Sequence, residues 1–236
     1  MTEFDYDGAS LPELLELLDS EDTSRRADAA CAIGDRLRTK ELLELDGAVR
    51  EKLAERVDDP VPMVKLEAAI ALAEAQDRRA TALLLDAMRF RQFRLDAIRS
   101  LGTLGDPAAL DPLRAVMGKI LMPWADKLQA AAALCALGDA DGARYLAERL
   151  TSRRLAERAA AVHFLGESRH PDALDTLAQI LGDAEHPLRD TAARALGLLG
   201  DPRGRVPLEA ALENASDSAL REDIERSLAQ LRLVTG

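Results

Sequence analysis

Apolar residues recur with a helical period along most of the chain, in segments that end alike. These segments are LGTLGD at Asp106, CALGD at Asp139, HFLGE at Glu167 and LGLLGD at Asp201, and they end 33, 28 and 34 residues apart. In most of these repeats, apolar residues at positions three, seven and ten after the helix's opening residue fall on one face. Gly-Asp then ends the helix, because glycine tolerates the left-handed cap. A period near thirty with two apolar helical stretches predicts stacked helical hairpins.

The spacing predicts seven hairpins, each with a first helix, called A, and a second helix, called B. The predicted A helices cover residues 11–19, 41–57, 79–89, 107–119, 141–151, 171–181 and 205–214. The predicted B helices cover residues 24–38, 61–76, 92–104, 124–137, 153–165, 186–199 and 218–233. The expected fold class is therefore all-α.

Three stretches carry this pattern most clearly. They are HPLRDTAARALGLLGDPRG (186–204), FRLDAIRSLGTLGDPAAL (93–110) and the looser DDPVPMVKLEAAIALAEAQD (58–77), where Gln76 replaces the glycine. They resemble the HEAT repeat family, in particular HEAT-like repeats of the phycobilin-lyase subtype, over nearly the whole chain. The resemblance implies a right-handed α-solenoid, an armadillo/HEAT-type superhelix of about seven helical hairpins whose B helices line a concave surface.

A single HEAT-like repeat domain over residues 1–236 is expected, with atypical hairpins at both ends. Residues 1–60 would form acidic N-terminal capping hairpins, 61–201 the regular repeats and 202–236 a C-terminal capping hairpin, because terminal repeats need a polar outer face. Residues 1–60 contain 17 acidic and 8 basic residues, a net charge of -9 out of -11 for the chain. The acidity therefore belongs to the first two hairpins.

Composition adds constraints on packing, partners and location. Hydrophobic residues make up 47% of the chain and aromatic residues only 3%, so helices should approach closely through Ala and Leu. The acidic balance opposes binding to nucleic acid and to anionic membranes. No apolar run reaches the ~18–20 residues that span a bilayer, and the start MTEFDYDGAS lacks a signal pattern. A soluble, cytoplasmic protein without membrane contact is expected.

The sequence offers no strong motif for catalysis, a cofactor or a metal. Phosphate loops, G-x-S-x-G, H-E-x-x-H and paired CxxC are all missing. The partial EF-hand register in LGDADGARYLAE has Leu137 at its first ligand position, which cannot bind Ca²⁺. Cys31 and Cys135 lie three predicted stacking steps apart, too far for a disulfide, and are expected to be free thiols. We therefore expect a non-enzymatic protein with no catalytic residue, cofactor or metal site.

Basic residues open most B helices and form a column. Its members are Arg26, Lys65, Arg94, Lys127, Arg189 and Arg221, whereas the fifth repeat has Leu155. The resemblance implies a structural ladder with aspartates of the neighbouring turns, so that Asp58, Asp59 and Asp183 would pair with Lys65 and Arg189.

Two further positions allow a structural and a functional interpretation. Arg89–Arg94 alternates bases with Phe90 and Phe93, which predicts two buried aromatic rings beside solvated arginines or, alternatively, contacts to nucleic acid. His163 stands in a column of small residues and is interpreted as a local widening between B helices rather than as a functional histidine.

Positions two, five and nine of the B helices point away from the apolar stripe, and the resemblance places them on the groove floor. They include the candidate partner-binding residues: acidic Asp28, Asp35, Glu67 and Glu74; basic Arg99 and Arg194; and apolar Ala132, Ala136, Ala160, Phe164 and Leu198. An apolar patch with a charged border is typical of a protein-binding site. The expected partner is another protein, a segment with an apolar anchor and a basic end. The alternative is that Phe164 and Leu198 belong to the core.

Three classes of function remain at this stage. The leading hypothesis is a non-enzymatic scaffold or adaptor that binds a protein partner in its concave groove. Resemblance to phycobilin lyase subunits implies the alternative of a chromophore-handling subunit. Some alkylpurine DNA glycosylases use similar repeats, but they require a positively charged concave face, and the acidic floor expected here opposes that third class.

Overall fold

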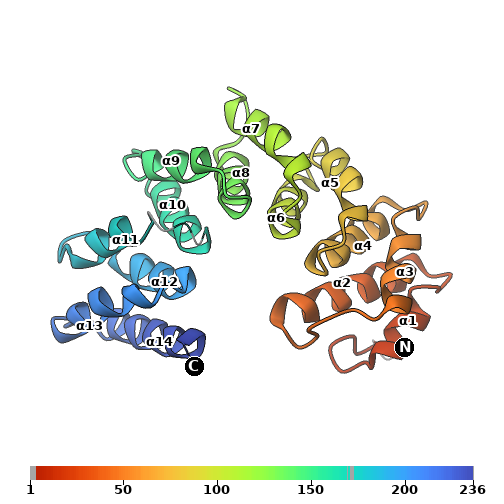
Figure 1. Ribbon diagram of the computed structural model, residues 1–236, viewed down its shortest axis with the longest axis horizontal. Coiled ribbons are helices and arrows are strands. Elements are labelled where there is room, and N and C mark those ends of the chain that lie inside the picture. The colour runs from red at the N-terminus through yellow and green to blue at the C-terminus, as the bar shows by residue number, and fades with distance from the viewer. Residues whose placement is uncertain (1–3, 169, 171–172, 236) are drawn as a thin grey trace. The chain divides into compact units, whose positions relative to one another are not determined.

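The computed structural model describes residues 4–168, 170 and 173–235, and every regular element in these ranges is helical (Figure 1). The predicted all-α class is therefore confirmed. The chain divides into two compact units, Met1–Pro112 and Leu113–Gly236, called unit 1 and unit 2. No helix in the described ranges is both long enough and apolar enough to cross a membrane.

Unit 1 consists of three consecutive helical hairpins and the beginning of a fourth. Its elements are α1 (Leu11–Leu17), α2 (Thr23–Thr39), α3 (Gly47–Arg56), α4 (Pro62–Glu74), η1 (Arg78–Ala80), α5 (Thr81–Ala87), α6 (Arg94–Leu104), η2 (Pro107–Ala109) and the start of α7 (Leu110–Gly118). The B helices α2, α4 and α6 pack in sequence, with α4 between the other two.

Unit 2 continues the alternation of A and B helices. Its elements after α7 are α8 (Trp124–Ala136), α9 (Ala140–Arg149), α10 (Leu155–Glu167), α11 (Ala173–Gly182), α12 (Arg189–Leu199), η3 (Pro202–Gly204), α13 (Arg205–Glu213) and α14 (Ser218–Thr235). The predicted A helix over 171–181 is observed from Ala173, and residues 171 and 172 lie outside the described residues. All seven predicted hairpins are thus present in the described ranges.

The second A helix begins later in the structure than the sequence pattern predicts. The second A helix was expected from residue 41, but α3 begins at Gly47. The side chain of Asp46 accepts a hydrogen bond from the Val49 amide at 2.9 Å and caps the helix there. An Asp in this role satisfies an amide that lacks an intrahelical partner, so the helix starts at this point.

Three of the four segment-ending glycines end helices as predicted, and one does not. Gly105, Gly138 and Gly200 have φ values of 68°, 78° and 70°, the left-handed conformation of a helix cap. Gly166 instead lies inside α10, which runs on to Glu167. A Cβ on Gly166 would lie 2.6 Å from the carbonyl oxygen of Ala195, so the residue permits close contact between α10 and α12.

Each unit has its own apolar core made mainly of Leu, Ile, Val and Ala. In unit 1 the largest fully buried side chains are Leu14, Leu18, Ile33, Leu53, Leu72, Leu84, Ile98 and Leu101. In unit 2 one cluster runs from α8 to α14 and includes Leu128, Leu146, Leu165, Leu177, Leu196, Leu208 and Ile224. The scarcity of aromatic residues in both cores agrees with the predicted packing through small side chains.

The basic column is a ladder, but most of its partners are main-chain carbonyls. Arg94 Nε donates to the Met88 carbonyl at 2.8 Å, and Arg189 Nε donates to the Leu181 carbonyl at 3.0 Å. A guanidinium that binds carbonyls at the end of a preceding helix satisfies acceptors left without partners there. In the fifth repeat Arg158 performs this role, donating to the Ser152 carbonyl at 2.8 Å.

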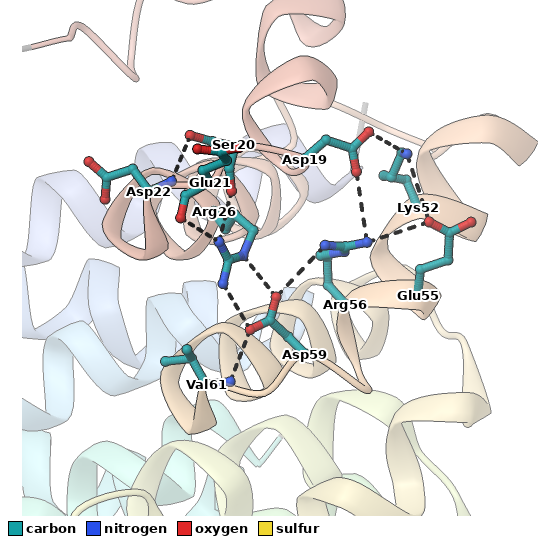
Figure 2. A network of polar contacts seen from close by, with 10 residues as sticks. All are labelled: Asp19, Ser20, Glu21, Asp22, Arg26, Lys52, Glu55, Arg56, Asp59 and Val61. Atoms are coloured by element: carbon teal, nitrogen blue, oxygen red, sulfur yellow. Dashed lines mark hydrogen bonds and ion pairs between the residues drawn. The ribbon is translucent and has the colours of Figure 1, made fainter.

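The predicted pairs of Lys65 and Arg189 with the aspartates that precede them are not observed among the described residues. Asp59 pairs with Arg26 of the preceding B helix, at 2.8 Å, instead of with Lys65 (Figure 2). Arg26 also donates to the Ser20 carbonyl at 2.7 Å. Asp183 accepts a hydrogen bond from the Glu185 amide, which closes its own turn. The network in Figure 2 therefore ties one hairpin to the next.

Aspartates of the Gly-Asp endings form a second set of links between neighbouring A helices. Asp106 caps the start of η2 through the Ala108 amide and accepts a hydrogen bond from Thr81 Oγ1 at 2.6 Å. Asp139 caps α9 and pairs with Arg114 at 2.5 Å. One carboxylate thus caps the start of one helix and contacts the preceding A helix. The Asp of the Gly-Asp ending therefore links neighbouring hairpins.

Candidate functional site

The B-helix face of unit 2 contains a cavity of about 540 Å³, called here the unit 2 cavity. It is formed by α10, α12 and α14, which pack side by side (Figure 1). Its lining residues are Ala159, Ala160, His163, Thr191, Arg194, Leu198, Arg226, Ser227 and Gln230. Ala160, Arg194 and Leu198 are candidate residues from the sequence analysis, so the structure brings three of them together.

The helical repeat of α12 explains why these residues face the cavity. Ala192, Ala195 and Leu196 are buried on one side of the helix, and this leaves Arg194 and Leu198 on the other. Two residues four apart share a helix face.

Close contact between α12 and α14 brings the cavity walls together. A Cβ on Gly197 would lie 2.9 Å from the Ser227 side chain. Ser227 is buried and lines the cavity, so the small residue at 197 allows α14 to form one wall.

Two arginines on the cavity wall share one buried carboxylate. Asp223 is 8% exposed and accepts hydrogen bonds from Arg194 Nη1 at 2.5 Å and Arg226 Nη1 at 3.2 Å. Arg194 also pairs with Asp190 at 3.2 Å, and Arg226 pairs with Glu222 at 2.7 Å. These contacts hold both guanidinium groups in defined positions.

His163 is an exposed member of the cavity lining. Its Nε2 lies 3.2 Å from Glu167, one helical turn away. The hydrogen bond with Glu167 raises the pKa of His163, against the opposing effects of burial and of Arg194. The sequence pattern predicts a packing role for His163, but the residue lines the cavity, a position that a column of small residues does not indicate.

The remaining candidate residues of unit 2 lie elsewhere. Phe164 packs against the apolar core of unit 2 rather than in the cavity lining, so the core alternative describes it better. Ala132 is only 7% exposed on α8, which packs against α9 and α10, and it is therefore no part of an open floor. Ala136 is exposed on the same helix but does not line the cavity.

The four candidate carboxylates of unit 1 belong to the B helices α2 and α4. Asp28 and Asp35 are exposed, whereas Glu67 and Glu74 are half-buried. Burial raises the pKa of Glu67 and, independently, the pKa of Glu74. The ionised forms are therefore less favourable here than in water, and a cationic partner would stabilise them.

Two arginines lie among these acids. Arg38 of α2 pairs with Asp35, and Arg99 of α6 pairs with Asp96 at 3.3 Å. Arg99 was among the candidate residues, but Arg38 was missed because it lies outside the three floor positions. The unit 1 face is thus a mixed surface in which carboxylates predominate.

Both cysteines are free, and both are poor nucleophiles. Burial raises the pKa of the Cys31 thiol to about 11 and that of the Cys135 thiol to about 12. Since the thiolate is the reactive form, these side chains stay protonated near neutral pH. Among the described residues no group of three or more His, Cys, Asp or Glu side chains could hold a metal ion.

A second cavity, of about 400 Å³, lies in unit 1 beside the turn that follows α5. Phe90 and Phe93 line it with Pro62 and Lys65, and the two rings stand edge to face at 6.4 Å. Phe90 is 50% exposed and Phe93 is half-buried, so the prediction of two buried rings is wrong. The reason is that Phe90 belongs to a turn rather than to a packed helix.

A protein-family model described as HEAT repeats matches residues 50–120, 117–188 and 145–229. Together these matches span most of the chain, and they include the helices that form the unit 2 cavity. The search of curated protein sequences gave no match.

Several solved structures are similar to this chain. The complex of CpcE and CpcF of phycocyanin lyase from Nostoc sp. PCC7120 matches over 98% of this chain and 99% of that chain, at 20% identity and a TM-score of 0.58. Human deoxyhypusine hydroxylase in complex with glycerol matches over 94% and 96%, at 21% identity and a TM-score of 0.43. Computationally designed armadillo repeat proteins match over 94% and 99%, at 16% identity and a TM-score of 0.37. At these identities the phycocyanin lyase match concerns the fold, an α-solenoid.

Proposed function

Because this chain belongs to the HEAT repeat family, we propose that it is a non-enzymatic scaffold or adaptor that binds a protein partner on the exposed faces of its B helices. Solenoid repeats create extended surfaces suited to long partner segments. Fold alone does not assign function, so the proposal depends on the surfaces that the structure describes.

The unit 2 cavity is the observation that carries this proposal. It combines apolar walls from Ala159, Ala160 and Leu198 with polar groups on its border, and it opens on the B-helix face. An apolar centre with a polar rim is the usual arrangement of a protein-binding surface. We infer that an apolar side chain of the partner occupies this cavity.

The unit 1 face would provide a separate contact for basic residues of a partner. Glu67 and Glu74 are seven residues apart on α4, so about 10 Å of helix separates them. Each is half-buried and would gain from a cationic neighbour. This contact corresponds to the basic end expected from the sequence.

A capture experiment tests the cavity with a single substitution. Tagged wild-type protein, Leu198→Asp and the control Val206→Asp would be incubated with lysate of the source organism, and bound proteins identified by mass spectrometry. Leu198 lines the cavity, whereas Val206 is 72% exposed on the A helix α13. The expected result is a partner held by wild type and Val206→Asp and lost at least tenfold with Leu198→Asp.

Folding must be checked in the same three proteins. Circular dichroism should give equal helicity and similar melting temperatures, because Leu198 is only half-buried. A partner captured equally by all three folded proteins would contradict the assignment of the cavity as the binding site. Phe164→Asp is unsuitable for this test because Phe164 packs on the core and its replacement would destabilise unit 2.

A chromophore-handling subunit is the alternative function. The likeness of fold to the phycocyanin lyase complex over nearly the full length of both chains is the observation that favours it. Co-expression with a bilin, followed by absorbance spectroscopy of the purified protein, separates the two functions. An adaptor should be colourless, and a bound pigment in the visible range would support the alternative.

A further inference from the structure

We propose that the partner segment entering the unit 2 cavity carries an acidic side chain beside its apolar anchor. This inference rests on the proposed function and specifies the chemistry of the partner at this one site. It differs from the basic end expected from the sequence, which concerns the carboxylates of unit 1.

The charged groups that line the cavity are all basic. Arg194, Arg226 and His163 reach its surface, and the apolar part of the lining comes mainly from Ala159, Ala160 and Leu198. An aliphatic side chain would bury its surface against the apolar part, while a carboxylate next to it would meet the bases. Charge complementarity of this kind gives a partner its register and specificity.

The nearby carboxylates are already engaged with these bases. Asp223 lies buried beneath the two arginines, and Asp190 and Glu222 each bind one of them from its own helix. None of these acids belongs to the cavity lining. They hold the guanidinium groups of the two arginines, and the charged side chains of the lining itself are Arg194, Arg226 and His163.

Both arginines keep donors for a ligand. Arg194 uses Nη1 and Nη2 in its contacts with Asp223, Asp190 and Thr191, and its Nε–H has no partner among the described residues. Arg226 likewise donates one hydrogen bond from each Nη, from Nη1 to Asp223 and from Nη2 to Glu222. A guanidinium has five N–H donors, so a partner carboxylate can accept charge-assisted hydrogen bonds from either residue.

His163 makes the proposed contact sensitive to pH. It faces Glu167 on its own helix and Arg194 on α12, and its proton is favoured by Glu167. A second carboxylate in the cavity would further stabilise the imidazolium form. Binding should therefore weaken as pH rises from 6 to 8, and the substitution His163→Gln should reduce this dependence.

A peptide selection tests the inference directly. Phage-displayed random dodecapeptides would be selected on the full-length chain, and binding of the enriched peptides to wild type, Leu198→Asp and Arg226→Gln would be measured by calorimetry. Arg226→Gln leaves Arg194 paired with Asp223, and circular dichroism would verify folding of each variant. Synthetic versions of one enriched peptide would carry its acidic residue, Gln or Lys at that position.

The expected peptides carry Leu, Ile, Val or Met beside Asp or Glu. Replacing the peptide acid by Gln should weaken binding about tenfold, as loss of a charge-assisted hydrogen bond does. Arg226→Gln should weaken the acidic peptide but not its Gln version, and Leu198→Asp should abolish binding of both.

Two other outcomes would overturn the inference in different ways. Neutral or basic peptides that need Leu198 and are indifferent to Arg226→Gln would refute the acidic partner but leave the proposed function intact. Failure to enrich any peptide whose binding depends on Leu198 would contradict both proposals.

Discussion

At Asp59 a single carboxylate links two hairpins of unit 1. It is 4% exposed and accepts hydrogen bonds from Arg26, at 2.8 Å, and from the Val61 amide, at 3.0 Å (Figure 2). Burial alone would raise its pKa, but these hydrogen bonds outweigh that effect and the pKa of Asp59 is lowered. The ionised form is therefore part of the folded structure.

Removing this charge should destabilise the protein markedly. Asp59→Asn leaves Arg26, itself 9% exposed, without its ionic partner, and the free energy of unfolding should fall by clearly more than for a substitution of an exposed aspartate. Urea denaturation at pH 7 would measure the loss. The neighbouring Asp58 is exposed, so Asp58→Asn serves as the control and should change stability by less than about 0.5 kcal/mol. Equal stability of the two variants would refute the role of the ion pair.

At the scale of the helices, Gly166 decides how closely α10 approaches α12. An added Cβ would lie 2.6 Å from the Ala195 carbonyl oxygen and 2.7 Å from its Cα, and neither atom can rotate away. The same two helices form part of the unit 2 cavity, so this contact also influences the candidate binding surface.

The substitution Gly166→Ala should therefore lower the melting temperature. Overpacking costs about 1–3 kcal/mol, which exceeds or cancels the helix-propensity gain of about 1 kcal/mol. Gly182→Ala is the matched control, since Gly182 ends α11 and an added Cβ meets no atom within 4 Å. That variant should be as stable as wild type or more stable. A rise in melting temperature with Gly166→Ala would show that the helices do not touch as described.

Across the whole molecule, acid stability should depend on aspartates in the turns of both units. Hydrogen bonds from Arg79 lower the pKa of Asp77 to about 2, and hydrogen bonds from Thr81 and Arg203 lower the pKa values of Asp106 and Asp201, respectively. A carboxyl with a lowered folded pKa stabilises the protein above its ordinary pKa near 4, and this contribution disappears as pH falls through the folded value.

We therefore expect the melting temperature to fall steeply between pH 4 and about pH 2. Asp77→Asn should melt below wild type at pH 7, and the difference should shrink towards pH 2, where protonation of the wild-type carboxyl is under way. Thermal melts followed by circular dichroism at several pH values would measure this convergence. Asp86→Asn, which removes an exposed pair with Arg89, should follow the wild-type curve. A constant difference for Asp77→Asn would contradict the lowered pKa.

Local signals in the chain are enough to predict the helices and their order as hairpins. Apolar residues every three to four positions, Gly-Asp endings and proline starts act within one turn of helix, and they located all seven hairpins. The same signals predicted which residues leave the apolar stripe, and three of these residues, Ala160, Arg194 and Leu198, line the unit 2 cavity.

The accessibility of individual side chains and the identity of their partners depend on how the helices pack. Phe164 and Leu198 look alike in the pattern, but one packs on the core and the other lines the cavity. Gly166 resembles a helix end, yet it serves a contact with α12. The physical reason is that burial, ion pairing and cavity shape depend on how closely neighbouring helices approach, and that distance is set by residues about thirty positions away in the chain.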